Sequence, residues 1–308
     1  MRPIVSLRSL RAARGASLVT VALAAAPAAA DDAGALYKQG ISWKNQGKDD
    51  EAIAAFEKAV AADAKHGMAW ASLGHLYKKK KMFPQAVDAY EHATQILTKD
   101  ATVWSNLGMA YYRVDRLDDA LAALQTSCKL DPKQADVFSN IGVIKRKKGD
   151  SEGALKALEW AVKLAPGEHS YVNNLGVAQR AANQLDAAAA SFAKAIELKS
   201  DVAEYYFNAA VVFRRQEEIE QAIPMYEKAV GLAPDHADAW YDLGYMYKLN
   251  HEDAKAVEAF NTFLELNKGK DAEAQKNVEG EVIALGGTPV TAPPKAAPKK
   301  APKKPKSK

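Results

Sequence analysis

The chain has 308 residues, 48% of them hydrophobic and 26% charged, and its 42 Lys and Arg outnumber its 38 Asp and Glu to give a formal net charge of +4. This hydrophobic content excludes a largely disordered chain, and the single cysteine, Cys128, excludes an intramolecular disulfide. Ala, Leu, Glu and Lys are abundant, and these residues favour helices.

Residues 1–30 differ from the rest of the chain. Their only charges are four arginines, followed by the apolar run 16–26 and by Ala28-Ala29-Ala30. A basic start, a short apolar run and small residues before the cut are the parts of a secretory signal peptide. We therefore predict that residues 1–30 are removed after Ala30 and that the protein is exported, to the periplasm or cell envelope or outside the cell. An organelle-targeting segment and an unstructured start are the alternatives.

The apolar run in this leader has eleven residues. A helix that spans a bilayer needs roughly 20 apolar residues. We therefore expect no transmembrane span.

The chain then repeats with a period of 34 residues. Trp70 and Trp104 are one period apart, and Trp240 follows four periods later. Counting from Ala33, the segment 31–270 holds seven blocks without a gap: 33–66, 67–100, 101–134, 135–168, 169–202, 203–236 and 237–270. We number the positions of each block as columns 1 to 34.

Some columns are nearly uniform. Column 8 is glycine in six blocks and Ala210 in the other, column 20 is always alanine, and column 24 is always Phe, Tyr or Leu. Columns 4, 7, 8 and 11 share one face of a first helix, columns 20, 24 and 27 share one face of a second, and polar residues at columns 15–18 predict a turn. Small residues at columns 8 and 20 let the two helices approach closely. The pattern predicts an all-α fold of stacked helical hairpins, an α-solenoid.

Three segments carry the clearest family resemblance: WASLGHLY at 70–77, WSNLGMAY at 104–111 and WYDLGYMY at 240–247. They resemble the tetratricopeptide repeat family, which has the same period and the same pattern of Trp, Leu-Gly, Tyr, Ala, Phe and Pro. The resemblance covers residues 33–270. It implies that the solenoid is a right-handed superhelix.

Two segments follow the repeats. Residues 271–287 fit a capping helix, with Val278, Val282 and Leu285 on one side and glycines at its end. Residues 288–308 contain seven lysines, six prolines and no acid, which predicts a disordered tail. Because all 38 acids lie between 31 and 287, that body has a net charge of −7 and the tail one of +7.

Catalytic and metal-binding patterns are absent from the sequence. It contains no Gly-rich phosphate loop, no H-E-x-x-H and no C-x-x-C. The six histidines form no pair at helical spacing, and His66 and His236 recur at column 34, where they are expected at the junctions between repeats. We therefore predict a protein that is not an enzyme and has no cofactor or metal.

The columns that do not pack within a hairpin indicate where a partner binds. In tetratricopeptide solenoids, by resemblance, columns 2, 5, 6, 9, 12 and 13 line the inner, concave surface. Column 6 holds four consecutive asparagines and an aspartate: Asn106, Asn140, Asn174, Asn208 and Asp242. An amide can donate to and accept from the backbone of any peptide. The alternative is that these asparagines position the helices.

Columns 9 and 12 flank this amide ladder. Column 9 gives an apolar floor of Val143, Val177 and Val211. Column 12 is cationic at six of its seven positions, including Lys78, Arg146, Arg180, Arg214 and Lys248, and column 13 adds Lys79, Arg113, Lys147 and Arg215. Such a basic stripe suits a partner with carboxylates, an acidic peptide or an anionic glycan. Alternatively, these cations only stabilise the C-terminal ends of the helices.

These patterns predict a non-catalytic, exported scaffold that binds an extended protein segment in its groove. The alternative is that the basic tail binds an anionic polymer: a cell-wall glycan, lipopolysaccharide or nucleic acid. A cytosolic chaperone tail is not the expected partner. Members of the family that bind such tails, by resemblance, pair a lysine at column 5 with an asparagine at column 9, and no block here supplies both.

Overall fold

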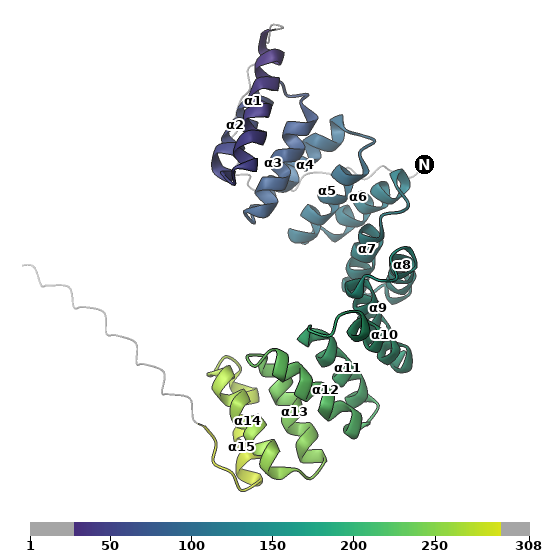
Figure 1. The fold of residues 1–308 in the computed structure, drawn as a ribbon, viewed down its shortest axis with the longest axis vertical. Helices are drawn as coiled ribbons and strands as arrows, with labels where there is room; N and C mark the ends of the chain where they lie inside the picture. The colour runs from purple at the N-terminus through teal and green to yellow at the C-terminus, as the bar shows by residue number, and fades with distance from the viewer. Residues whose placement is uncertain (1–27, 291–308) are drawn as a thin grey trace, which may run out of the picture. The chain divides into compact units, whose positions relative to one another are not determined.

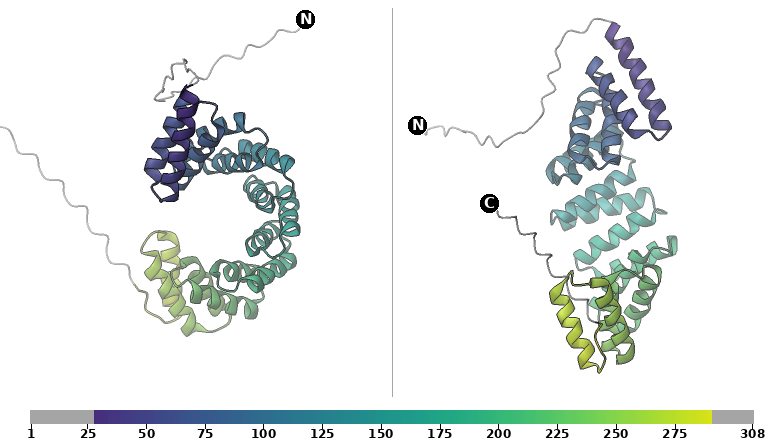
Figure 2. Two further views of the ribbon diagram at one scale, coloured as in Figure 1. Left: turned by 45° about the horizontal axis from the view of Figure 1, so that its top comes forward. Right: turned by 90° about the vertical axis from the view of Figure 1, so that its left-hand side faces the viewer.

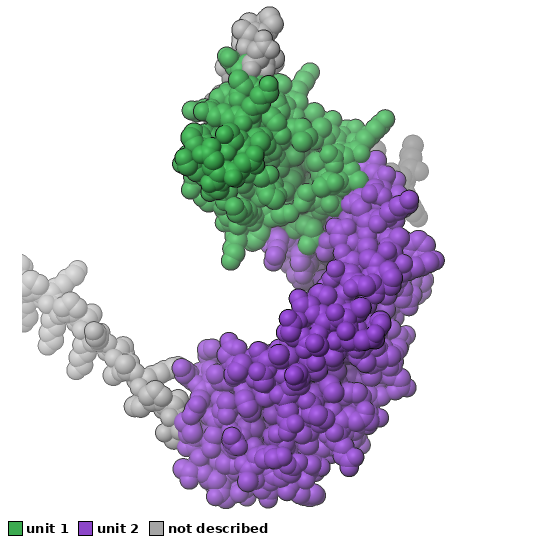
Figure 3. Space-filling view, viewed as in Figure 1, with its two compact units in different colours: residues 1–110 green, residues 111–308 purple. Residues whose placement is uncertain are grey.

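A computed structural model describes residues 28–290, apart from the side chains of residues 28–31. The chain divides into two compact units, residues 1–110 and residues 111–308, each described by itself (Figure 3). Within the described residues every regular element is a helix. The leader up to residue 27 lies outside this range, so its predicted cleavage and the export that depends on it remain predictions.

The helices follow one another as hairpins within each unit (Figures 1 and 2). Unit 1 contains α1 (Ala28–Asn45), α2 (Asp49–Ala62), α3 (Gly67–Lys79), α4 (Phe83–Ile96) and most of α5 (Ala101–Arg113). Unit 2 contains the end of α5 and α6 (Leu117–Leu130), α7 (Ala135–Lys147), α8 (Ser151–Leu164), α9 (His169–Ala181), α10 (Leu185–Leu198), α11 (Ala203–Arg215), α12 (Ile219–Leu232), α13 (Ala237–Leu249), α14 (Asp253–Asn267) and α15 (Ala272–Ala284).

The core of each hairpin is built as columns 8 and 24 predict. A Cβ placed on Gly74 would lie 2.8 Å from the ring of Tyr90, and one on Gly176 would lie 2.7 Å from that of Phe192. Both rings are fully buried. Glycine at column 8 therefore allows the first helix to lie directly against the large side chain of the second.

The turn inside each hairpin uses a left-handed residue at column 15. Seven residues one period apart, two of them glycines, have φ between 59° and 81°: Gly47, Lys81, Asp115, Gly149, Asn183, Glu217 and His251. This conformation costs a residue with a Cβ roughly 1–2 kcal/mol. The turn geometry is thus kept even where the sequence offers no glycine.

Consecutive repeats are joined by hydrogen bonds that recur with the same period. The indole Nε1 atoms of Trp70, Trp104 and Trp240 each donate to a backbone carbonyl six residues earlier, at 2.9–3.0 Å. That carbonyl belongs to column 32 of the preceding block. The recurring tryptophan thereby links the first helix of these hairpins to the end of the preceding hairpin.

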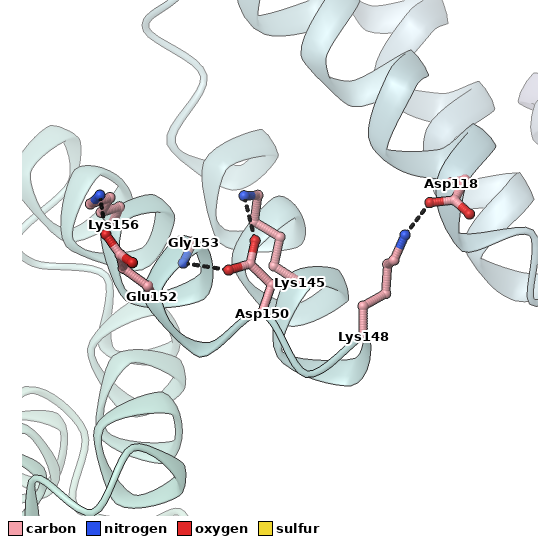
Figure 4. Close-up of polar contacts among 7 residues, drawn as sticks. All are labelled: Asp118, Lys145, Lys148, Asp150, Glu152, Gly153 and Lys156. Atoms are coloured by element: carbon pink, nitrogen blue, oxygen red, sulfur yellow. Dashed lines mark hydrogen bonds and ion pairs between the residues drawn. The ribbon is translucent and has the colours of Figure 1, made fainter.

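Figure 4 shows how one hairpin in unit 2 is held at its turn. Asp150 caps α8 by accepting from the backbone N–H of Gly153 at 2.9 Å, and its other oxygen pairs with Lys145 at 2.8 Å. Next to it, Lys148 forms an ion pair with Asp118 of the preceding hairpin. The turn is therefore stabilised both within its own repeat and toward its neighbour.

The segment predicted to cap the array, 271–287, contains α15. Val278 and Val282 are fully buried, and Asp271 caps the helix by accepting from Ala274 N. The first residues of the predicted tail lie against α14, because the side chain of Asn261 bonds to Thr288 O and Val290 N at 3.2 and 2.9 Å. Residues 291–308 lie outside the described residues.

Candidate functional site

The predicted binding columns fall on the first helices of successive hairpins. In unit 2, α7, α9 and α11 lie side by side, with α9 in contact with both of its neighbours. Each carries an asparagine at column 6, a valine at column 9 and an arginine at column 12. We call this surface, made by columns 6, 9 and 12 of α7, α9 and α11, the first-helix face of unit 2.

The amide column of this face is largely hydrogen-bonded inside the protein. Asn174 Nδ2 donates to Ser139 Oγ at 3.1 Å, and Asn208 Nδ2 donates to Asn173 Oδ1 at 3.1 Å. Asn208 and Asn173 are both only 5% exposed. Asn174 and Asn208 thus join neighbouring repeats by hydrogen bonds to residues at column 5. Asn208 is too buried to contact a ligand.

Asn140 differs from these two rungs. Its side chain is partly exposed and forms no hydrogen bond to any other described residue. Among the predicted asparagines of unit 2, it therefore has the largest unused capacity to donate to and accept from a peptide.

Asp242 ends the amide column on α13. Its carboxylate accepts from the hydroxyl of Tyr226 at 3.0 Å and lies 3.7 Å from the guanidinium of Arg214. Burial raises the pKa of Asp242 above its ordinary value, although Arg214 opposes that shift. This residue belongs to an internal polar cluster.

The valines are shared between the face and the core. Val177 packs against the cluster that contains Phe192, and Val211 packs against the cluster that contains Tyr226. All three valines remain partly exposed. They can offer apolar contact to a ligand without leaving their packing positions.

The column-12 cations differ in their partners. Lys78 Nζ, in unit 1, donates to Asn106 Oδ1 at 2.7 Å, and Lys248 pairs with Glu281 of α15. The side chains of Arg146 and Arg180 have no hydrogen-bond or ion-pair partner among the described residues. Within unit 2, where Arg214 and Lys248 have acidic partners, the basic column is therefore least neutralised on α7 and α9.

The column-13 cations mainly hold the preceding turn. Lys79 pairs with Asp49 and Lys147 with Asp115, each at 2.6 Å. Arg215 donates to Asn183 Oδ1 at 2.8 Å and to the carbonyl of Arg180 at 3.0 Å. These contacts assign Lys79, Lys147 and Arg215 to the structure of the solenoid.

Unit 2 also contains a cavity that the repeat pattern did not predict. A cavity of about 490 Å³ opens between α13, α14 and α15, lined by Tyr241, Phe263 and Lys270 among others. Tyr241 and Tyr245 stack edge to face, with ring centroids 4.9 Å apart. Aromatic residues at both column 5 and column 9 of one block, found only in the seventh, were the available signal.

Within the described residues no group of three or more His, Cys, Asp or Glu side chains could hold a metal ion. Nor does any helix in residues 28–290 have the length and apolarity needed to cross a membrane. Cys128 is partly buried, and burial raises the pKa of its thiol to about 11, with Asp136 and Asp131 adding to the shift.

Two family profiles match the sequence. One describes the tetratricopeptide-repeat C-terminal domain of cilia and flagella-associated protein 70 and matches residues 8–239; the other, described as a tetratricopeptide repeat, matches residues 207–275. The chain belongs to the tetratricopeptide repeat family. The predicted all-α solenoid of tandem hairpins is thereby confirmed, and this family is in general non-catalytic.

Solved tetratricopeptide structures agree. The crystal structure of MamA is 25% identical over 52% of this chain and 94% of its own, with a TM-score of 0.51. YrrB, described as a tetratricopeptide protein with an unusual peptide-binding site, is 23% identical over 61% and 96%, with a TM-score of 0.52. Part of a repeat protein from Cytophaga hutchinsonii is 20% identical over 78% and 98%, with a TM-score of 0.63. No curated protein matches the chain.

Proposed function

We propose that this tetratricopeptide protein is a non-catalytic scaffold that binds an extended polypeptide segment on the first-helix face of unit 2. The observation that carries the proposal is the recurrence of Asn, Val and Arg on three adjacent helices, where Asn140, Arg146 and Arg180 have no partner in the described chain. Asn140 and Arg180 are partly buried, and polar groups left partly buried and unpaired favour a ligand that pairs with them.

The spacing of the helices suits an extended ligand. Packed helices lie about 8–10 Å apart, and three residues of polyproline II helix advance a little over 9 Å, since each rises about 3.1 Å. A peptide that crosses α7, α9 and α11 would therefore present one residue in three to successive helices. The peptide-binding site named for YrrB supports the same class of ligand.

The test uses peptides selected from a random-sequence library on the purified protein, with dissociation constants measured by fluorescence anisotropy. Asn140→Ala removes one amide pair and should weaken binding about 2–10-fold, because a hydrogen bond contributes about 0.5–1.5 kcal/mol. Gln125→Ala, which removes an exposed amide from α6, is the matched control and should change nothing. Equal affinities for the wild type and both variants would show that the ligand binds elsewhere.

We also propose that the chain is exported to the periplasm or cell envelope. The basic, apolar and small-residue segments of residues 1–30 support this. The intact mass of the protein recovered from its native cell should correspond to a chain that begins at Asp31. A mass that retains residues 1–30 would contradict the proposal and leave the binding function unaffected.

A further inference from the structure

The first-helix face of unit 2 gathers positive charge in a body whose net charge is negative. Arg146, Arg180 and Arg214 occupy column 12 of three adjacent helices, and Arg215 lies next to them on α11. Asp242 is the one acid among the described residues that forms an ion pair with any of these four arginines, at 3.7 Å from Arg214. One carboxylate thus forms the ion pairs that these four guanidinium groups have among the described residues.

Arg180 lies at the centre of this cluster. Its pKa is lowered first by burial and then by the charges of Arg215, Arg146 and Arg214. A half-buried arginine that is repelled by its neighbours and lacks an acidic partner is costly for the free protein. Bound carboxylates would offset this cost, because guanidinium groups bind carboxylates through two parallel hydrogen bonds.

We infer that the cluster of Arg146, Arg180 and Arg214 binds an acidic polypeptide segment that presents Asp or Glu at every third residue of a polyproline II conformation. This conformation places every third side chain on one face, a little over 9 Å apart, which matches the spacing of packed helices. The inference rests on the proposed function, since it specifies the ligand of the same face. Asn140 and the column-9 valines lie on the same helices and can contact the backbone between the acids.

The test uses fluorescein-labelled (Glu-Ala-Pro)3, with (Gln-Ala-Pro)3 as its neutral counterpart. The wild type should bind the acidic peptide at least about tenfold more tightly, with an affinity that falls as salt rises. In Arg146→Gln/Arg180→Gln/Arg214→Gln, affinity for the acidic peptide should fall at least about tenfold, while that for the neutral peptide stays the same.

The matched control is Lys156→Gln/Lys163→Gln/Lys194→Gln, which removes the same charge from exposed positions on α8 and α10. It should change the affinity less than twofold. An equal loss in both triple variants would overturn the inference, since it would show attraction by general charge. Arg146→Gln alone, at an exposed side chain, repeats the test if the triple variant unfolds.

Two further comparisons examine the ligand itself. A peptide of the same composition with its three Glu adjacent should bind more weakly. Equal binding of the two peptides would overturn the inference that the acids must stand at every third residue. Inorganic polyphosphate that binds more tightly than the acidic peptide, and only when the arginines are present, would overturn a polypeptide as the occupant. If library peptides bind but acidic ones do not, the acidic ligand is wrong and the scaffold function stands; if neither binds, the scaffold function fails as well.

Discussion

At the scale of single residues, this protein keeps backbone geometry even where the side chain opposes it. Column 15 adopts a left-handed conformation in every repeat, although only Gly47 and Gly149 lack the Cβ that opposes it. Asp242 shows a comparable conflict, since its side chain is only 13% exposed although it is an acid. Both conflicts have measurable consequences.

Replacement of Glu217 by glycine should stabilise the protein. Glu217 has a φ of 62°, it is exposed, and its side chain has no partner in the described chain. Relief of the left-handed strain, less the entropy that glycine adds to the unfolded chain, should raise the free energy of unfolding by about 0.5–1 kcal/mol in urea titrations. The control Glu159→Gly, inside α8, should lower the free energy of unfolding by about 1 kcal/mol. Loss of stability in both variants would show that Glu217 is not strained.

Acidification should raise the stability of the wild type relative to that of the Asp242→Asn variant. Because burial raises its pKa in the folded state, the folded protein binds the proton more readily than the unfolded chain does. The destabilisation caused by the ionised carboxylate is therefore present near pH 7 and is lost as the pH falls through the raised pKa toward the ordinary value of 3.8.

The measurement is the difference in unfolding free energy between the wild type and Asp242→Asn at pH 7 and at pH 4. That difference should move in favour of the wild type on acidification, and the same comparison for Asp235→Asn, at an exposed position, serves as the reference. A shift in favour of the variant would mean that Arg214 outweighs burial.

At the scale of helices, the distance between the two members of a hairpin depends on the pair at columns 8 and 24. Gly176 faces Phe192 so closely that a methyl group has no room, and the other column-8 glycines whose surroundings are described face their partners in the same way. The sixth repeat shows that the pair can be rebuilt, because Ala210 and Tyr226 are both fully buried there. The hairpin is thus set by the two columns jointly.

Gly176→Ala should therefore lower the free energy of unfolding by about 1–3 kcal/mol, the usual cost of overpacking a core. Its control is Gly280→Ala in α15, where nothing lies within 4 Å of the new Cβ. That change should be neutral or stabilise by up to about 1 kcal/mol, since alanine favours helices. Thermal or urea unfolding measures both, and equal effects would mean that column 8 is not a contact position.

At the scale of the whole molecule, each hairpin of the solenoid is stabilised by the adjacent ones. α15 buries Val278 and Val282 against the cluster that contains Phe260 and Phe263, and it lines the cavity beside Tyr241. Removal of α15 would expose this apolar surface, and in repeat proteins such a loss is felt first by the neighbouring repeat.

Truncation after Lys270 should accordingly speed amide hydrogen exchange in α13 and α14 while leaving α1 to α4 of unit 1 unchanged. The full-length chain is the reference, and a truncation after Val290, which keeps α15 and the contacts of Asn261, is the matched control. Uniform acceleration in both units would indicate that the array unfolds as one cooperative block.

The sequence by itself determined the repeat, the two helices of each hairpin and the close contact of columns 8 and 24. Core positions must recur with the period of the fold, and they are read directly as small or large apolar residues. The polar residues at columns 15–18 predicted the turn, but not its left-handed conformation, because the residues at column 15 share a backbone angle and no side-chain type. The predicted face was only partly readable from the sequence, because a column of like side chains does not show which of them have partners inside the protein.

Only the tertiary structure decided which polar residues of that face have partners inside the protein. Asn140, Asn174 and Asn208 are identical in sequence, yet Asn174 and Asn208 bond to column 5 of the preceding repeat and Asn140 does not. Likewise, Lys147 pairs with Asp115 whereas Arg146, one residue earlier, has no partner in the described chain. A hydrogen bond depends on which atoms lie within about 3 Å. These partners are 35 or 32 positions apart in the sequence, and they come that close only when the hairpins stack.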